Sequence, residues 1–128
     1  MKYLQNICIL VNCCPKQHVK KVFLKNIDIK NTLTIVDELA LPLEKLRLRP
    51  GGSDAGHNGL KDIQLALNTT EYPKLRFGIG NNFPKGRQVE FVLGKWNEQE
   101  ITIVKRKIDA CTEIIENFVL MGIEKTMN

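Results

Sequence analysis

The sequence predicts a single α/β domain in which a mixed β-sheet is sandwiched by helices. Short apolar and β-branched segments, such as Thr32–Val36, alternate with segments whose apolar residues recur every three or four positions. This alternation is typical of strands that take turns with helices in a mixed or largely parallel sheet. The length of 128 residues allows one domain with one core. The apolar fraction of 43% and the charged fraction of 26% are ordinary for a globular protein.

The N-terminal region is expected to contain a strand and then a short helix. Residues 2–12 include the longest uninterrupted apolar run, Ile7–Val11, which predicts a buried strand. This run is too short to span a bilayer and short for the apolar region of a signal peptide. We therefore expect a cytoplasmic protein with no membrane partner. Pro15 can open a helix that runs through Phe23.

The middle of the chain predicts two strands of different character. Thr32–Val36 ends at Asp37-Glu38, as a buried strand does when it delivers acidic residues to its carboxyl end. Leu46–Arg49 alternates strictly, so one face of that strand is apolar and the other carries two arginines. Pro50 ends the second strand.

A glycine-rich loop, Gly51–Gly56, leads into the next helix. We expect this helix to begin at His57 or Asn58, because the apolar residues that follow recur at helical spacing: Leu60, Ile63 and Leu67. Leu75–Ile79 is a further strand candidate, and Asn81–Gly86 predicts a surface loop.

The last third of the chain predicts a short extended piece, Val89–Leu93, and then a long helix. Asn97 with Glu100 forms an N-cap and capping-box pattern at the start of that helix. Gly122 is a natural stop. Spacings of three and four place six apolar side chains on one helical stripe: Ile101, Val104, Ile108, Cys111, Ile115 and Phe118.

Cysteine spacing and net charge limit the classes of function. Cys8, Cys13 and Cys14 crowd the N-terminus and Cys111 stands alone, with no CxxC pair, so we expect free thiols and no metal site. Nineteen Lys and Arg residues against fourteen Asp and Glu residues give a net charge of +5. This balance suits a polyanionic partner, although charge alone does not identify one.

Two features of the predicted fold are candidates for a ligand site. In open α/β sheets, ligands bind beyond the carboxyl ends of the strands, where Asp37 is expected; the alternative is that Asp37 only caps a loop. The loop Gly51–Gly56 lets the backbone approach a ligand closely, and the helix after it offers N–H groups to an anion. A plain turn is the alternative, and the loop does not match the nucleotide motif GxxxxGK[ST].

Two pairs of side chains could act at such a site. His57 and Asn58 place an imidazole and an amide at the lip of the loop, with capping or hydrogen bonding as the alternative to catalysis. Arg47 and Arg49 would present two cations about 6–7 Å apart, near the phosphate spacing of a nucleic-acid strand. A solvated arginine face is the alternative for that pair.

Five collinear blocks of the sequence resemble the bacterial peptidyl-tRNA hydrolases. Their order and spacing agree with that family from about Val19 to the C-terminus, and the GHNGLKDI and LRFGIG blocks are specific. The blocks are Ile35–Pro42, Leu46–Arg49, Gly56–Ile63, Leu75–Gly80 and Phe91–Lys95. The resemblance implies an α/β enzyme that cleaves the ester between a peptide and the 3′ end of tRNA, which recycles the tRNA, and that needs no metal or cofactor.

The resemblance also implies roles for single residues. Asp37 matches the aspartate that orients the family's catalytic histidine. Asn58 matches the asparagine that helps to bind the substrate and the reacting water, and His57 matches the neighbouring histidine, whose role is secondary. Asn12 matches, more loosely, an asparagine of an FMNLSG-like block that holds the substrate end.

Three basic residues, Arg47, Arg49 and Arg76, resemble those with which the family grips tRNA phosphates. If they form such a phosphate clamp, the affinity for tRNA should fall steeply with salt. Each Arg→Ala change should then flatten the log–log slope by about one unit or less.

The N-terminal segment departs from the family pattern. Family members begin with a strand, a GLGNPG-like loop and a TRHN motif that bears the catalytic histidine, and nothing similar follows Met1–Leu4. His18 lies in a different context, inside the helix expected after Pro15. We therefore expect a fold truncated at its N-terminus, with an atypical segment at 1–18 and a peptidyl-tRNA hydrolase-like domain at 19–128.

Three functions stay open on the sequence alone. The first is an active peptidyl-tRNA hydrolase, the second is a catalytically inactive domain that binds tRNA ends, and the third is a compact fold without a function. Without a histidine in the family's context, we expect slow hydrolysis or binding alone. We also expect a monomer, with association if the truncation leaves a sheet edge open.

Overall fold

The computed structural model describes residues 8–11 and 26–127, and a four-stranded mixed sheet forms its centre. The spatial order is β1 (Cys8–Val11), β2 (Thr32–Glu38), β4 (Lys74–Gly78) and β3 (Leu46–Arg49). β1, β2 and β4 are parallel, and β3 is antiparallel to β4. The four predicted strands are confirmed, and their ends differ from the expected ones by at most two residues.

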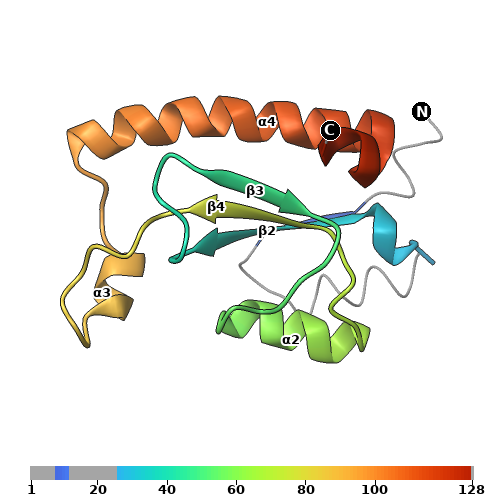
Figure 1. The fold of residues 1–128 in the computed structure, drawn as a ribbon, viewed down its shortest axis with the longest axis horizontal. Coiled ribbons are helices and arrows are strands. Elements are labelled where there is room, and N and C mark those ends of the chain that lie inside the picture. The colour runs from blue at the N-terminus through green and yellow to red at the C-terminus, as the bar shows by residue number, and fades with distance from the viewer. Residues whose placement is uncertain (1–7, 12–25, 128) are drawn as a thin grey trace.

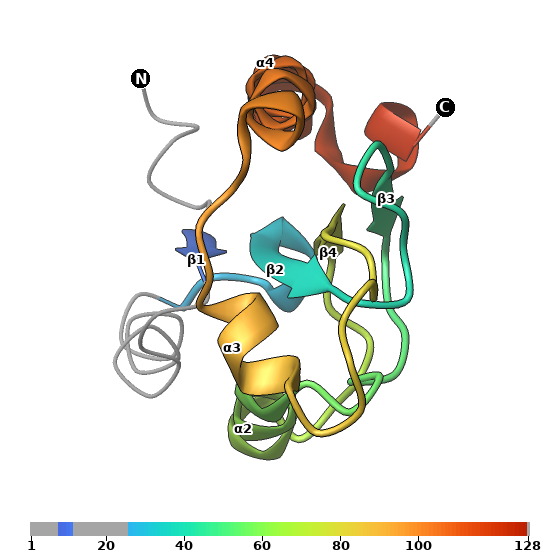
Figure 2. The same ribbon diagram turned by 90° about the vertical axis from the view of Figure 1, so that its left-hand side faces the viewer.

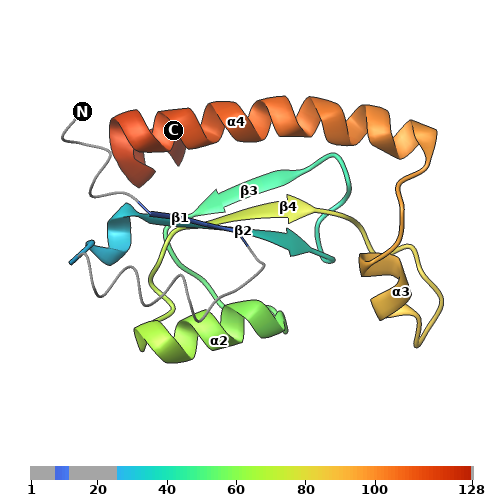
Figure 3. The same ribbon diagram turned by 180° about the vertical axis from the view of Figure 1, so that it is seen from behind.

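Helices lie on both faces of this sheet, as the sequence predicts. α2 (Asn58–Leu67) lies on one face, and α4 (Glu98–Met127) runs across the other (Figure 1 and Figure 2). α3 (Gln88–Val92) lies at the end toward which β2 and β4 point, and the view from behind shows the same arrangement (Figure 3). Among the described residues, no helix is both long and apolar enough to cross a membrane.

Two apolar clusters fill the space on either side of the sheet. The cluster beside α2 contains Ile27, Val36, Leu60, Ile63, Leu67 and Tyr72. The cluster beside α4 contains Leu33, Leu48, Leu75 and Phe118. β2 contributes to both clusters because successive residues of a strand point to opposite faces. The apolar face expected for the helix after the glycine-rich loop is confirmed, since its three residues are buried.

The segment expected to be extended, Val89–Leu93, is helical instead, so that prediction is wrong. Backbone bonds of helical spacing join the Phe91 N–H to the Arg87 carbonyl and the Leu93 N–H to the Val89 carbonyl. The Arg87 Nε also donates to Glu90 at 2.7 Å, a pair three residues apart that suits a helical turn. A five-residue apolar segment does not by itself distinguish a strand from a short helix.

α4 begins as expected and is interrupted where a stop was expected. The Asn97 side chain accepts the Glu100 N–H, and Glu100 accepts the Asn97 N–H, each at 2.8 Å, so the capping box is confirmed. Gly122 has a φ of 80°, which breaks the helical backbone before the final turns up to Met127. Of the predicted stripe, Cys111, Ile115 and Phe118 pack in the core cluster, Val104 is half-buried, and Ile101 and Ile108 are exposed.

The remaining N-terminal predictions lie outside the described residues. They are the helix opened by Pro15, the role of Asn12, the context of His18, and the boundary between residues 18 and 19. They stay predictions.

Candidate active site

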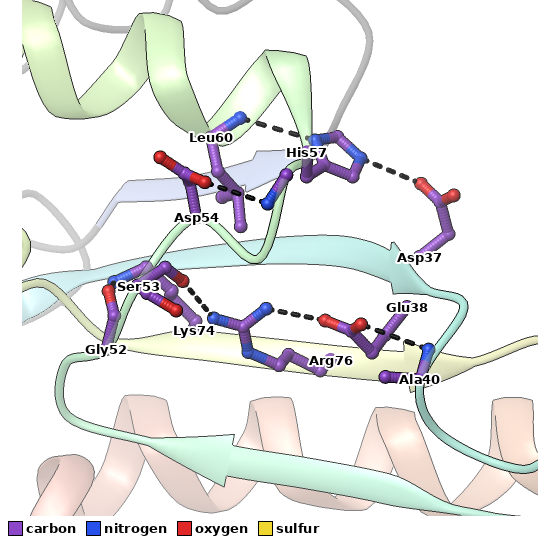
Figure 4. A network of polar contacts seen from close by, with 11 residues as sticks. Asp37, Glu38, Ala40, Gly52, Ser53, Asp54, His57, Leu60, Lys74 and Arg76 are labelled. Carbon is purple, nitrogen blue, oxygen red and sulfur yellow. Dashed lines mark hydrogen bonds and ion pairs between the residues drawn. The ribbon is translucent and has the colours of Figure 1, made fainter.

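The carboxyl end of β2 meets the N-terminus of α2 through a pair of side chains. Asp37 Oδ1 lies 3.1 Å from His57 Nε2, so a carboxylate and an imidazole are in hydrogen-bond contact (Figure 4). Both side chains are partly buried, with 29% of Asp37 and 19% of His57 exposed. Burial of this degree shields the pair from bulk water while leaving it open to a ligand.

The second nitrogen of His57 also has a partner. His57 is the N-cap of α2, and its Nδ1 accepts the Leu60 N–H at 3.3 Å. Because Nδ1 accepts, the proton of the neutral ring is on Nε2, which donates to Asp37. The carboxylate of Asp37 therefore fixes the orientation of the imidazole. Both ring nitrogens of His57 are used in hydrogen bonds, so neither offers a lone pair to a water molecule.

The glycine-rich loop is folded so that it delivers His57 to this position. Asp54 accepts the Gly56 N–H with its carboxylate and the His57 N–H with its carbonyl, each at 2.8 Å. Ala55 and Gly56 have φ angles of 50° and 79°, in the region that favours glycine. The loop is thus a specific turn at the helix N-terminus, as its position in the sequence indicates.

A cavity of about 390 Å³ lies over this pair of side chains, with Asp37, His57 and Asn58 in its wall. Asp37 and Asn58 thus line one concave site, as we expect from the strand end and the loop. Val89 and Val92 of α3 also line this cavity, together with Leu93, which directly follows that helix. One part of the cavity wall is therefore polar, and another part is apolar.

A second cavity, of about 710 Å³, adjoins the first and shares Asp37 and Val92 with it. Its wall includes Ile35, Phe77 and Trp96, from the sheet and from the segment before α4. Both cavities lie at the carboxyl end of β2, where Asp37 lines each of them.

The three arginines of the expected phosphate clamp lie in two different environments. Arg47 and Arg49 are exposed on β3, at the edge of the sheet, where a phosphate can reach them. Arg76 is paired in register with Arg47 on the adjacent β4, but its side chain is only 9% exposed. Its guanidinium binds Glu38 at 2.6 Å and the Ser53 carbonyl at 2.5 Å. Two of the three arginines are thus exposed and the third is buried, and the contact of all three with tRNA phosphates stays a prediction.

Two further charged residues, Lys74 and Glu38, belong to the same network and were not expected. Lys74 is buried and donates to the carbonyls of Gly52 and Thr70 at 2.9 and 2.8 Å. Burial, followed by the repulsion of Arg76, lowers the pKa of Lys74 to about 8. The alternation of Lys74 and Arg76 with apolar residues is the signal that could have placed both on one face of a strand.

Comparison with known proteins matches this fold and its sequence. A family model described as peptidyl-tRNA hydrolase matches residues 16–128. The chain belongs to the peptidyl-tRNA hydrolase family. The peptidyl-tRNA hydrolase of Parabacteroides distasonis is 55% identical over 104 residues, which cover 81% of this chain and 56% of that protein. That of Phocaeicola vulgatus is 49% identical over the same coverage.

The crystal structure of peptidyl-tRNA hydrolase from Acinetobacter baumannii is similar with a TM-score of 0.80 and 30% identity. That match covers 89% of this chain and 58% of the other. The chain therefore spans somewhat more than half the length of the peptidyl-tRNA hydrolases that it matches.

Proposed function

We propose that this chain acts on peptidyl-tRNA, as a hydrolase of the ester that joins a peptide to the tRNA 3′ end. The observation that supports this most is the Asp37–His57 hydrogen bond beside Asn58, in a cavity at the N-terminus of α2. An ester of this kind has a polar reacting carbon and an apolar or mixed peptide. The polar and apolar walls of the cavity suit those two parts.

The chemistry assigns a separate task to each side chain. Hydrolysis needs a general base that takes a proton from the attacking water, a group that orients that base, and donors for the oxyanion that forms on the ester carbonyl. Asn58 and the N–H groups at the start of α2 supply the donors, and Asp37 with His57 holds the local geometry. Arg47 and Arg49, exposed at the sheet edge, contact the phosphates of the tRNA. We assign the chain to the cytoplasm, as a tRNA-binding monomer that works in translation.

A second candidate function is binding of tRNA ends without turnover. Its support is that both ring nitrogens of His57 already hold hydrogen bonds, so this imidazole does not accept a proton from water as it stands. The loss of a general base typically slows a reaction by about 10²–10⁴-fold. We therefore expect binding to be retained and hydrolysis to be slow.

The test is a side-by-side assay of this chain and the Parabacteroides distasonis relative on one peptidyl-tRNA. We expect the affinities to agree within about tenfold and the rate of this chain to be lower by about 10²–10⁴-fold. Asp37→Asn should change that low rate little, because Asp37 orients an imidazole that does not take the proton. The same assay is run on His18→Ala, to test whether His18 supplies the base.

Each outcome decides between the candidates. A rate above the uncatalysed one that Asn58→Ala abolishes supports the hydrolase, whereas binding with no such rate supports the second candidate. A fast reaction that His18→Ala abolishes would assign the base to His18. No detectable binding of peptidyl-tRNA would refute both.

A further inference from the structure

Lys74, the first residue of β4, carries an ammonium group that is enclosed by the backbone. The residue is only 1% exposed. Its Nζ donates to the carbonyl oxygens of Gly52 at 2.9 Å, Thr70 at 2.8 Å and Tyr72 at 3.3 Å. Nζ also lies 3.7 Å from the centre of the Tyr72 ring, whose face attracts a cation. The three protons of the ammonium thus meet three acceptors.

These three carbonyls come from two separate segments of the chain. Thr70 and Tyr72 belong to the segment between α2 and β4, whereas Gly52 belongs to the glycine-rich loop before α2. Gly52 and Lys74 are 22 residues apart in the sequence, and Figure 4 shows them side by side. One ammonium therefore joins the glycine-rich loop to the start of a central strand.

The loop needs such a contact because it has no regular structure of its own. Gly52 has a φ of 130° and Gly56 a φ of 79°, so the backbone at both positions depends on glycine. Asp54 holds the end of the loop next to the helix, where it accepts the N–H groups of Gly56 and His57. The start of the loop is bound from outside, at the Gly52 carbonyl. The position of His57 therefore depends on where the loop starts.

Lys74 differs from the other cation that contacts this loop. Arg76 donates to the Ser53 carbonyl at 2.5 Å, and its guanidinium has five N–H donors, so it can bind a further group. The ammonium of Lys74 has three donors, and backbone carbonyls take all of them. The contact between Lys74 and the loop is thus one that a bound ligand leaves unchanged.

The charge of Lys74 is what the carbonyls bind. Burial, followed by the repulsion of Arg76, lowers the pKa of Lys74 to about 8, and Glu71 opposes that change. The side chain therefore stays mostly protonated at neutral pH. Rings of backbone carbonyls also hold K⁺ in proteins, in place of its water shell. The three carbonyls around Nζ are accordingly suited to a monovalent cation, and Lys74 supplies one that is attached to the strand.

We propose that Lys74 is a positioning residue whose ammonium acts as a tethered monovalent cation. It holds the glycine-rich loop to the start of β4 and so places His57 against Asp37. This inference concerns the free protein, and it rests on the proposed function only where the binding of RNA is measured.

The experiment compares Lys74→Ala, which leaves space at the three carbonyls, with Lys74→Met, whose apolar chain fills that space. Lys30→Ala is the matched control, because Lys30 is 74% exposed and its loss changes the net charge equally. Each protein is measured at neutral pH in tetramethylammonium, potassium or ammonium chloride of equal ionic strength. The first readout is the ¹⁵N spectrum of the His57 imidazole in the free protein, which reports its tautomer and its bond to Asp37. The second is the affinity for an RNA minihelix with a peptide amide-linked to its 3′ end.

A tethered cation predicts that both substitutions at Lys74 alter the His57 signals in tetramethylammonium chloride, whose cation is too large for the three carbonyls. Potassium or ammonium chloride should restore the signals of Lys74→Ala and leave those of Lys74→Met altered. The affinity of Lys74→Ala for the minihelix should fall about tenfold and recover in the same two salts. The wild type and Lys30→Ala should give the same His57 signals in all three salts.

Wild-type His57 signals of Lys74→Ala in tetramethylammonium chloride would overturn the proposal. Altered signals that neither potassium nor ammonium restores would also overturn it, because the aliphatic chain of Lys74 would then matter and not its charge. If Lys74→Ala does not fold in any salt, Lys74→Met decides: altered His57 signals support the proposal, and wild-type signals refute it. If no protein binds the minihelix, the proposed function fails, and the His57 spectra still decide the role of Lys74.

Discussion

Gly78, at the end of β4, is packed more closely than any side chain would allow. A Cβ atom at this position would lie 2.1 Å from the Pro42 carbonyl oxygen and 2.9 Å from the Leu41 Cβ. The Gly78 N–H also donates to the Lys45 carbonyl at 3.0 Å, which ties β4 to the turn that precedes β3. This glycine is therefore required by close backbone approach and not by a turn conformation.

We expect Gly78→Ala to lower the free energy of unfolding by about 3 kcal/mol, the upper part of the usual range for overpacking, because backbone atoms must move. Gly51→Ala is the matched control. There the added Cβ would meet the carboxylate of Glu71, an exposed side chain that can rotate away. Urea unfolding measures both variants. If Gly78→Ala and Gly51→Ala lose the same free energy of unfolding, the close contact with Pro42 does not explain the cost of a side chain at Gly78.

At the scale of elements, α4 is held to the sheet by a buried lysine as well as by apolar packing. Lys107 is 5% exposed, its Nζ donates to the Gly78 carbonyl at 2.5 Å, and it lies 3.7 Å from the centre of the Phe77 ring. Burial lowers the pKa of Lys107 to about 8, with Glu44 and Cys111 opposing that change. Lysine is rarely buried in this way. Through its contacts with Phe77 and Gly78, Lys107 joins α4 to the end of β4 beside the candidate site.

This lowered pKa predicts a pH dependence of stability. Between about pH 8 and pH 10.5, the unfolded chain keeps the proton of Lys107 and the folded chain releases it. The free energy of unfolding of the wild type should therefore rise with pH over this window, relative to that of Lys107→Met, by at most about 3 kcal/mol. Urea unfolding of both proteins at intervals of half a pH unit measures this difference in the free energy of unfolding. A difference that stays constant with pH would contradict the prediction.

At the scale of the whole molecule, β2 and β4 belong to both halves of the core. Each is hydrogen-bonded on two sides, and they contribute residues such as Leu33, Val36 and Leu75 that are at most 2% exposed. β3 has one neighbouring strand among the described residues, and the first turns of α4 carry exposed apolar residues such as Ile101. Stability should therefore decrease from the centre of the sheet outward.

Hydrogen exchange followed by mass spectrometry checks this order. We expect the amides of β2 and β4 to exchange most slowly, near the rate set by global unfolding. Those of β3 and of α4 before Cys111 should exchange faster, because fewer buried contacts protect them. Faster exchange in β4 than in the first turns of α4 would contradict this account of the core.

Patterns that are local in the chain could be predicted from the sequence. The strand Leu46–Arg49, the buried face of α2 and the capping box of Asn97 and Glu100 each depend on residues a few positions apart. The family resemblance was also carried by short blocks, and the family match supports it. Periodicity and capping depend on a few consecutive residues, so they can be recognised without knowing which distant segments pack beside them.

The sequence by itself predicted the four strands, the helices α2 and α4, and the proximity of Asp37, His57 and Asn58. Only the tertiary structure decided that Arg76 is buried against Glu38, that Lys107 reaches the Gly78 carbonyl, and that α3 is helical. The partners Arg76 and Glu38 are 38 residues apart, and Lys107 and Gly78 are 29 residues apart. Whether a charged side chain faces water or a buried carboxylate depends on which distant segment packs beside it, and no local pattern records that choice.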